Sequence, residues 1–129
     1  MKYSREELRQ RVIDAVALAL DRRPAGVRMH SSLIDDLGAE SIDFLDIRFR
    51  IESEFGLKIS DDEMWQGELL PGHPELVTER GVSDQGLRLL QERMPEFRWE
   101  RFPNGITAAD LPRLITPETI VAYLEKRLL

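Results

Sequence analysis

Apolar residues recur every three or four positions in four stretches of the chain, which is the spacing that gives a helix one hydrophobic face. We predict helices over residues 4–21, 40–55, 83–94 and 116–128. The acidic residues that follow Ser60 suit the start of a further short helix. The predicted fold class is therefore all-α.

The expected helix ends hold residue types that start or stop a helix. Ser4 with Glu7 forms the pattern of a capping box, in which each side chain bonds the other residue's backbone. Gly56 is suited to end the second helix because glycine tolerates a left-handed backbone. Thr116 can cap the last helix, and Pro117 fits its first position because no amide donor is needed there.

Residues 65–112 differ in composition from the rest of the chain. They hold five of the seven prolines, five of the eight glycines and both tryptophans. The alternation in Phe97-Arg98-Trp99 predicts a short strand, and Asn104-Gly105 predicts a turn. The large aromatic side chains indicate that this segment packs and is not a disordered tail. We interpret four of them as core residues and not as a ligand cage: Trp65, Phe97, Trp99 and Phe102.

Length and composition exclude several functions. A chain of 129 residues is long enough for one domain, and 42% hydrophobic with 33% charged residues fits neither a membrane span nor a disordered chain. The absence of cysteine removes disulfides, thiolate catalysis and Cys-ligated metal sites. The net charge of -6 argues against nucleic acid as a partner. The polar first residues argue against a signal peptide, so we expect a cytoplasmic protein. We also expect a monomer without stable membrane insertion.

The negative charge is concentrated in one short stretch. Residues 35–55 contain seven acidic side chains against Arg48 and Arg50, and so contribute -5 to the total of -6. Such a field would attract basic partner surfaces and speed their encounter. The alternative is a solvated helix face whose charges only keep the chain soluble.

Ser41 stands at the start of the second predicted helix, after a turn that contains Gly38. The simple interpretation is a helix cap, although Phe44, three residues later, completes no capping box. Ser41 is a poor candidate for an enzyme nucleophile, because the two histidines, His30 and His73, both fall in predicted loops. A hydroxyl exposed on an acidic helix end is better suited to modification by another protein.

The residues around Ser41 resemble a known motif. Asp36-Leu37-Gly38-Ala39-Glu40-Ser41-Ile42-Asp43 is similar to the phosphopantetheine attachment site of acyl carrier proteins. The core of that site is Asp-Leu-Gly, a variable residue, Asp or Glu, Ser, Leu or Ile, and Asp. The likeness continues through residues 45–47 and 51–60, and it resumes at residues 115–124.

The resemblance implies a four-helix carrier bundle with a partly irregular insertion before the last helix. We expect a single domain over 1–129, with a carrier core at 4–64 and 113–128 and an insertion at 65–112. Three hypotheses for the insertion stay open. It could cover an enlarged acyl pocket, dock one partner enzyme, or elaborate the structure without a separate activity.

The resemblance also implies a carrier and not an enzyme. A phosphopantetheinyl transferase would move 4′-phosphopantetheine from coenzyme A onto the Ser41 hydroxyl. The thiol of that group would hold an acyl chain as a thioester for acyl-loading and acyl-transferring enzymes. Residues 39–43 follow the fatty-acid and polyketide pattern more than that of peptidyl carriers. Acyl cargo is therefore expected, in the synthesis of a fatty acid, an unusual lipid or a polyketide.

Residues on and before the second helix are assigned to two roles. Partner enzymes are expected to contact Asp36, Leu37, Glu40, Ile42, Asp43, Asp46, Arg48 and Phe49. The core or an acyl pocket is expected to contain Leu45, Ile47, Ile51 and Phe55. Arg48 and Arg50 depart from the family pattern, and we expect them to alter partner choice or to pair with acidic neighbours on the same helix.

Two other functions remain as alternatives. The first is an unmodified interaction domain that keeps the carrier fold. The second is an enzyme whose site lies in the insertion and uses acidic residues, arginines and His73. No motif supports it, because the chain lacks a Walker loop, HExxH and GxSxG, and the acidic run at 35–46 lacks the spacing of an EF-hand metal site. We interpret His73 as a solvated loop residue.

Overall fold

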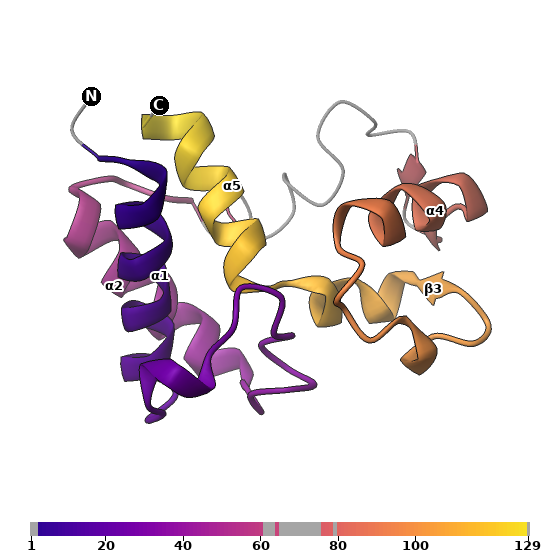
Figure 1. Cartoon of the computed structure of the whole chain (residues 1–129), viewed down its shortest axis with the longest axis horizontal. Helices are drawn as coiled ribbons and strands as arrows, with labels where there is room; N and C mark the ends of the chain where they lie inside the picture. The colour runs from indigo at the N-terminus through magenta and orange to yellow at the C-terminus, as the bar shows by residue number, and fades with distance from the viewer. Residues whose placement is uncertain (1–2, 61–63, 65–75, 79, 129) are drawn as a thin grey trace.

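The computed structural model describes residues 3–60, 64, 76–78 and 80–128, and it is mostly helical (Figure 1). Its α-helices within these ranges are α1 (Arg5–Ala19), α2 (Ser41–Phe55), α4 (Asp84–Arg93) and α5 (Pro117–Leu128). Its shorter elements are η1 (Pro24–Gly26), β1 (Val77–Thr78), β2 (Gly81–Val82), η3 (Trp99–Arg101), β3 (Ile106–Thr107) and η4 (Ala108–Leu114).

The predicted helical class, with a partly irregular segment before the last helix, is confirmed. Most of the short helix expected after Ser60 lies outside the described residues, as do Trp65 and His73. None of the described helices is long and apolar enough to cross a membrane.

α1, α2 and α5 form the first of two hydrophobic cores, which we call the carrier core. α1 packs against both α2 and α5 (Figure 1). Each helix turns its apolar face inward, because burying one Leu, Ile or Val side chain contributes about 1.5–3 kcal/mol. The fully buried members are Leu8, Val12, Val16, Leu33, Ile47, Ile51, Ile120, Val121 and Leu124.

The helix ends predicted at Ser4, Gly56 and Thr116 are confirmed, while α1 ends at Ala19, two residues before the predicted end. Ser4 Oγ accepts a hydrogen bond from Glu7 N at 3.1 Å, and Glu7 Oε1 accepts one from Ser4 N at 3.4 Å. Gly56 ends α2 in the left-handed region, at a φ of 65°. Thr116 and Thr119 cap α5 reciprocally, with N–H to Oγ1 distances of 3.0 and 3.3 Å. These bonds satisfy amides that a helix end otherwise leaves unpaired.

The described part of the insertion folds around a second hydrophobic core, which we call the insertion core. The predicted helix is confirmed as α4, and Ser83 Oγ caps it by accepting from Gly86 N at 3.1 Å. β1, β2 and β3 form a small antiparallel sheet in that order. The buried members of the insertion core are Leu76, Leu90, Phe97, Phe102, Ile106 and Leu114.

The strand predicted at Phe97-Arg98-Trp99 is wrong. Trp99 instead begins a 3₁₀ turn, and its Nε1 donates to Met94 O at 2.8 Å. The ring centroids of Phe97 and Trp99 lie 4.7 Å apart. Both rings pack in the same core, and the backbone around them turns, because Trp99 N donates to Phe97 O at 3.0 Å and Phe102 N donates to Trp99 O at 3.0 Å. The turn predicted at Asn104-Gly105 is confirmed, with Gly105 at a φ of 87°.

Candidate functional site

The loop that leads into α2 is anchored at both ends. Leu33, Leu37 and Ala39 are buried in the carrier core. Leu33 N donates to Ile115 O at 3.0 Å, and Ala39 N donates to Leu33 O at 2.8 Å. The start of α2 is thus tied to the core and to the connection that enters α5.

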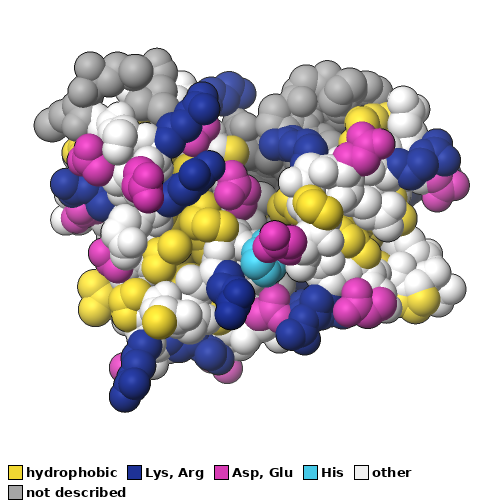
Figure 2. Space-filling model, viewed as in Figure 1, with side chains coloured by type: hydrophobic (Ala, Val, Ile, Leu, Met, Phe, Trp, Pro, Cys, Tyr) yellow, Lys and Arg dark blue, Asp and Glu magenta, His cyan; other side chains and the backbone are white. Residues whose placement is uncertain are grey.

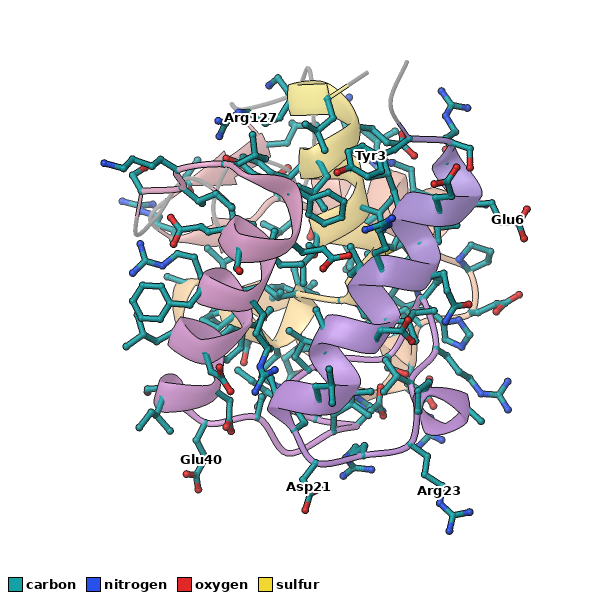
Figure 3. All side chains as sticks on the ribbon, turned by 90° about the vertical axis from the view of Figure 1, so that its left-hand side faces the viewer. Tyr3, Glu6, Asp21, Arg23, Glu40 and Arg127 are labelled. Carbon is teal, nitrogen blue, oxygen red and sulfur yellow. The ribbon has the colours of Figure 1, made fainter. Side chains whose placement is uncertain are left out.

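Ser41 is the first residue of α2, and its side chain is exposed. Glu40, and not Ser41, is the cap of α2, because Glu40 has an extended backbone and its N donates to Asp43 Oδ2 at 2.8 Å. The interpretation of Ser41 as the cap is therefore wrong. Figure 3 shows Glu40 at this end of α2 with its side chain pointing outward. Within the described part of the chain, nothing forms a hydrogen bond with the Ser41 hydroxyl, so this group is available for covalent attachment.

The position of Ser41 suits a phosphate-bearing group. A phosphate on its hydroxyl would lie at the N-terminus of a helix of 15 residues. The first amides of a helix have no partner in the helix and the helix dipole is positive there, so negative charge is stabilised. Because the side chain is exposed, a long group attached to it can extend outward without displacing the core.

α2 also exposes a row of apolar side chains beside Ser41. Ile42 is 70% exposed, Leu45 44% and Phe49 54%. Their spacing of three and four residues places them on one face of the helix. The core position predicted for Leu45 is therefore wrong, because the residue lies on the outward face.

The opposite face of α2 is buried as predicted. Ile47 and Ile51 are 0% exposed and Phe55 is 7% exposed. Phe55 also meets the Tyr3 ring edge-on, with 5.2 Å between the ring centroids. These contacts confirm that the three residues belong to the core, and their part in an acyl pocket stays a prediction.

Charged residues of α2 bond within the molecule. Arg50 Nε lies 3.1 Å from Asp46 Oδ1, which confirms one of the expected local pairs. Arg48 Nη1 donates to Ile59 O at 2.9 Å, across the turn that follows α2. Its guanidinium also lies over the Phe49 ring, 5.3 Å from the centroid. A partner would therefore meet these side chains already held by neighbours.

The structure corrects the predicted partner contact of Leu37, and it shows that the Asp36 carboxylate is already bound within the chain, so partner contact by Asp36 stays a prediction. Leu37 is only 5% exposed, so it supports the loop from inside and offers no surface to a partner. The Asp36 carboxylate is occupied, because Ser32 N donates to Oδ2 at 2.8 Å and Arg101 binds Oδ1. Burial raises the pKa of Asp36, but the hydrogen bonds from Ser32 and Arg101 outweigh it and hold the pKa below 3.8.

Two arginines at this site are missed by the sequence analysis. Arg101 binds Asp36, which precedes it by 65 residues, and Arg113 binds Asp35, which precedes it by 78 residues. No local pattern links positions that far apart. The weak signal was the presence of arginines in an otherwise acidic segment.

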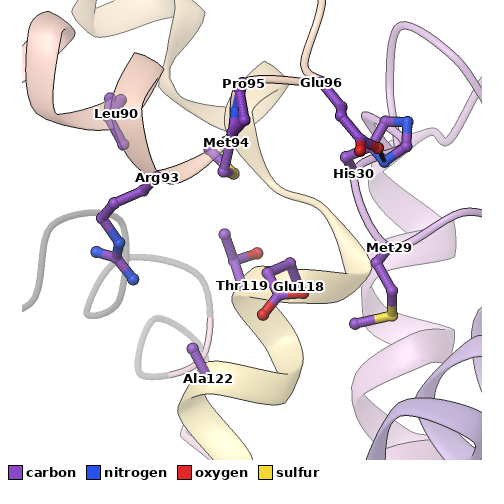
Figure 4. A pocket seen from close by; sticks show the side chains of 10 residues that line it. All are labelled: Met29, His30, Leu90, Arg93, Met94, Pro95, Glu96, Glu118, Thr119 and Ala122. Carbon is purple, nitrogen blue, oxygen red and sulfur yellow. Dashed lines mark ion pairs between the residues drawn. The ribbon is translucent and has the colours of Figure 1, made fainter.

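A cavity of about 420 Å³ lies between the two cores, and its apolar lining includes Met29, Leu90, Met94 and Ala122 (Figure 4). His30 Nδ1 and Glu96 Oε2 pair beside it at 3.0 Å. Figure 2 shows an imidazole next to an acidic side chain at this junction. The α2 residues that were predicted to line an acyl pocket do not line this cavity, so the cavity is not the predicted acyl pocket.

Comparison with known proteins matches the first half of the chain. Residues 10–68 match the family described as PP-binding, phosphopantetheine attachment site, and this range includes Ser41. The chain is 39% identical over 61 residues to the acyl carrier protein of Thermotoga maritima, across 47% of this chain and 75% of that protein.

Two further relatives are acyl carrier proteins named AcpXL. The one from Rhizobium etli is 44% identical over 62 residues, across 48% of this chain and 66% of the relative. The one from Rhizobium meliloti is 42% identical over 62 residues, across 48% of this chain and 64% of the relative. The chain thus spans just under two thirds of the length of each AcpXL, and most of the insertion lies beyond the residues matched by the family.

Proposed function

This chain belongs to the acyl carrier protein family, and we propose that Ser41 is the residue that bears its 4′-phosphopantetheine group. The exposed, unbonded hydroxyl of Ser41 on the first turn of α2 is the observation that supports this assignment. Modification would leave the helix cap intact, since Glu40 and Asp43 form it. When bound, the group supplies a thiol that holds an acyl chain as a thioester.

The chain's own residues present this group to partner enzymes. Acyl carrier proteins meet phosphopantetheinyl transferases and acyl-handling enzymes. We propose that these partners contact the outward face of α2, where Ile42 and Phe49 are more than half exposed beside Ser41. Apolar and aromatic side chains of this kind contribute strongly to binding when a partner covers them. The exposed Glu40 adds negative charge at the edge of the same face.

The proposed cargo is an acyl chain, and the proposed setting is the synthesis of a fatty acid, an unusual lipid or a polyketide. The sequence Ala39-Glu40-Ser41-Ile42-Asp43 supports acyl over aminoacyl cargo. The buried apolar face of α2, with Ile47, Ile51 and Phe55, is the part of the core proposed to shelter that chain.

Mass spectrometry of the intact protein tests the attachment site. The full chain is incubated with a purified phosphopantetheinyl transferase and coenzyme A, and we expect the mass to rise by one phosphopantetheine group. Ser41→Ala should abolish the adduct. Ser53→Ala is the matched control, because Ser53 is an exposed serine near the other end of α2 and should be modified like the wild type.

Other outcomes point to different functions. A wild-type chain without an adduct supports the unmodified interaction domain. An adduct that survives Ser41→Ala shows that another residue is the acceptor. Hydrolysis of model substrates by the unmodified chain would support an enzyme site in the insertion.

A further inference from the structure

Two arginines bind the acidic residues that precede Ser41: Arg101 in the insertion, and Arg113, which directly follows the predicted insertion and lies in η4. Arg113 Nε lies 2.9 Å from Asp35 Oδ2, and Arg101 Nη1 lies 3.3 Å from the same oxygen. Arg101 also binds Asp36 through its second terminal nitrogen. These side chains are mostly shielded from solvent, with exposed fractions of 17% for Asp35 and 18% for Arg101. The three ion pairs therefore lie at the junction of the insertion and the motif, where the side chains are shielded although Asp35 as a residue is exposed.

Each arginine is oriented by the insertion itself. The Arg113 guanidinium lies 4.3 Å from the centroid of the Phe102 ring, and its Nη1 lies 3.0 Å from Asp110 Oδ1. Arg101 lies over the Phe97 ring at 6.0 Å. Both rings belong to the insertion core, so the positions of the two cations depend on that core.

The two acidic residues are held from their own side as well. Ser32 N donates to Asp36 Oδ2 at 2.8 Å, and Ser32 Oγ accepts from Asp35 N at 3.0 Å. Ser32 Oγ also donates to Arg113 O at 2.7 Å, which joins the loop before α2 to the chain that enters α5. Arginines and carboxylates thus meet in a network with little freedom to turn toward a partner.

This network changes the charge that a partner meets. Residues 35–55 have an excess of five negative charges. Arg101 offsets one of them, and Arg113, which also binds Asp110, offsets part of a second. The Arg50 charge, which pairs with Asp46 on α2, is already included in that excess. The surface beside Ser41 consequently presents exposed Ile42 and Phe49 together with Glu40, and it has less negative charge than the sequence predicts.

We propose that Arg101 and Arg113 determine partner specificity, because they withhold Asp35 and Asp36 from basic partner surfaces during the modification of Ser41. The inference rests on the proposed function. In this arrangement, a partner gains affinity from apolar contact with α2 and gains little from steering toward the acidic pair. The insertion thereby disfavours partners that recognise their carrier by negative charge.

The test is the salt dependence of Ser41 modification in the full chain. The probe is a purified phosphopantetheinyl transferase with a lysine- and arginine-rich acceptor face, assayed from about 50 to about 500 mM salt. Arg101→Gln with Arg113→Gln should lower KM about ten-fold at low salt, with kcat nearly unchanged, which is the lower end of steering effects. The salt dependence of kcat/KM should also steepen. Arg101→Lys with Arg113→Lys should restore much of the wild-type behaviour, because the positive charges are kept.

A matched control distinguishes the release of Asp35 and Asp36 from a general change in the net charge of the protein. Arg80→Gln with Arg88→Gln alters the net charge equally at two exposed positions of the same insertion. We expect KM in this control to stay within about two-fold of the wild type, because exposed charges at a distance are screened by salt. An equal drop in KM in both double variants would overturn the proposal.

Carboxyl labelling provides a second measurement. Carbodiimide coupling, followed by peptide mass spectrometry, should label Asp35 and Asp36 weakly in the wild type and several-fold more in Arg101→Gln with Arg113→Gln. Asp84, exposed at the start of α4, is the internal reference. If the double variant loses its helical signal in circular dichroism, Arg113→Gln alone is used. If, in the wild-type chain, Asp35 and Asp36 are labelled as strongly as Asp84, the proposal is contradicted.

The outcomes distinguish this inference from the proposed function. A wild-type chain that is never modified contradicts the function of Ser41 and the inference with it. A chain that is modified at Ser41, with KM and salt dependence unaffected by the arginine variants, contradicts the inference alone.

Discussion

The carrier core and the insertion core are built in different ways. The carrier core joins three helices of 12 to 15 residues, each of which pairs its own backbone and presents one apolar face. The insertion core collects residues from α4, from strands of two residues and from 3₁₀ turns. Strands that short are not stable alone, so the insertion depends on its aromatic and aliphatic packing.

The contrast extends to the place where the two parts meet. The carrier core is held by apolar contacts, whereas its loop before α2 is joined to the insertion by ion pairs and hydrogen bonds. Polar junctions respond to pH and salt in ways that apolar cores do not. We therefore expect pH and salt to act on this junction more than on the carrier core.

Large-to-small substitutions in each core provide the largest expected effects. Ile120→Ala in the carrier core and Leu90→Ala in the insertion core should each lower the free energy of unfolding by about 2–5 kcal/mol, because both side chains are buried. Ile120→Ala should mainly shift the helical transition in circular dichroism, and Leu90→Ala the tryptophan fluorescence transition. If both signals shift together in both variants, the two cores unfold as one unit and the contrast does not hold.

Gly81→Ala should damage the insertion alone. Gly81 has a φ of 116°, and a Cβ there would lie 2.1 Å from Ile106 O on the neighbouring strand. Backbone strain of this kind costs about 1–3 kcal/mol before the clash is counted. Gly105→Ala is the control, since Gly105 also has a positive φ but has open space around the added carbon. The melting temperature should fall more in Gly81→Ala than in Gly105→Ala. Equal decreases would mean that the neighbouring strand moves away from the added carbon without loss of stability.

Acid should weaken the polar junction before it weakens the carrier core. Because the folded-state pKa of Asp36 is below 3.8, the unfolded chain binds more protons, and the stabilisation present above pH 3.8 is lost as the pH falls through the folded value. The melting temperature should therefore fall as the pH drops through and below about 4, and less steeply in Arg101→Gln. An unchanged slope in that variant would show that the pair does not contribute.

Asp46→Asn should have the smallest effect. The Asp46–Arg50 pair lies on the surface of α2, with exposed fractions of 43% and 41%. Exposed pairs four residues apart contribute about 0.3–0.5 kcal/mol, and salt weakens them further. Chemical denaturation at low and high salt measures this difference. A loss comparable to that of Leu90→Ala would show that surface charge on α2 matters more than the burial pattern indicates.

The local features of the fold were predictable from the sequence, and the wrong predictions share one cause. The helices, the caps at Ser4, Ser83 and Thr116 and the turn at Gly105 follow from residues within four positions of one another, whereas the cap of α2 is Glu40 and not Ser41. Phe97 and Trp99 alternate like strand residues, but contacts with Met94 and with each other favour a turn. Leu45 is hydrophobic like a core residue, yet the orientation in which α2 packs leaves its side chain on the exposed face of the helix.

The sequence by itself determined the helical class, the helix ends and the motif that singles out Ser41, because each depends on neighbours along the chain. Only the tertiary structure decided that Asp36 is occupied and that Leu37 is buried. It also decided that Arg101 and Arg113 stand against the acidic pair, from positions 65 and 78 residues later in the chain. The physical reason is that the sequence gives the position of each charge along the chain. Whether a charge is neutralised depends on which distant side chain the fold brings within a few ångströms of it.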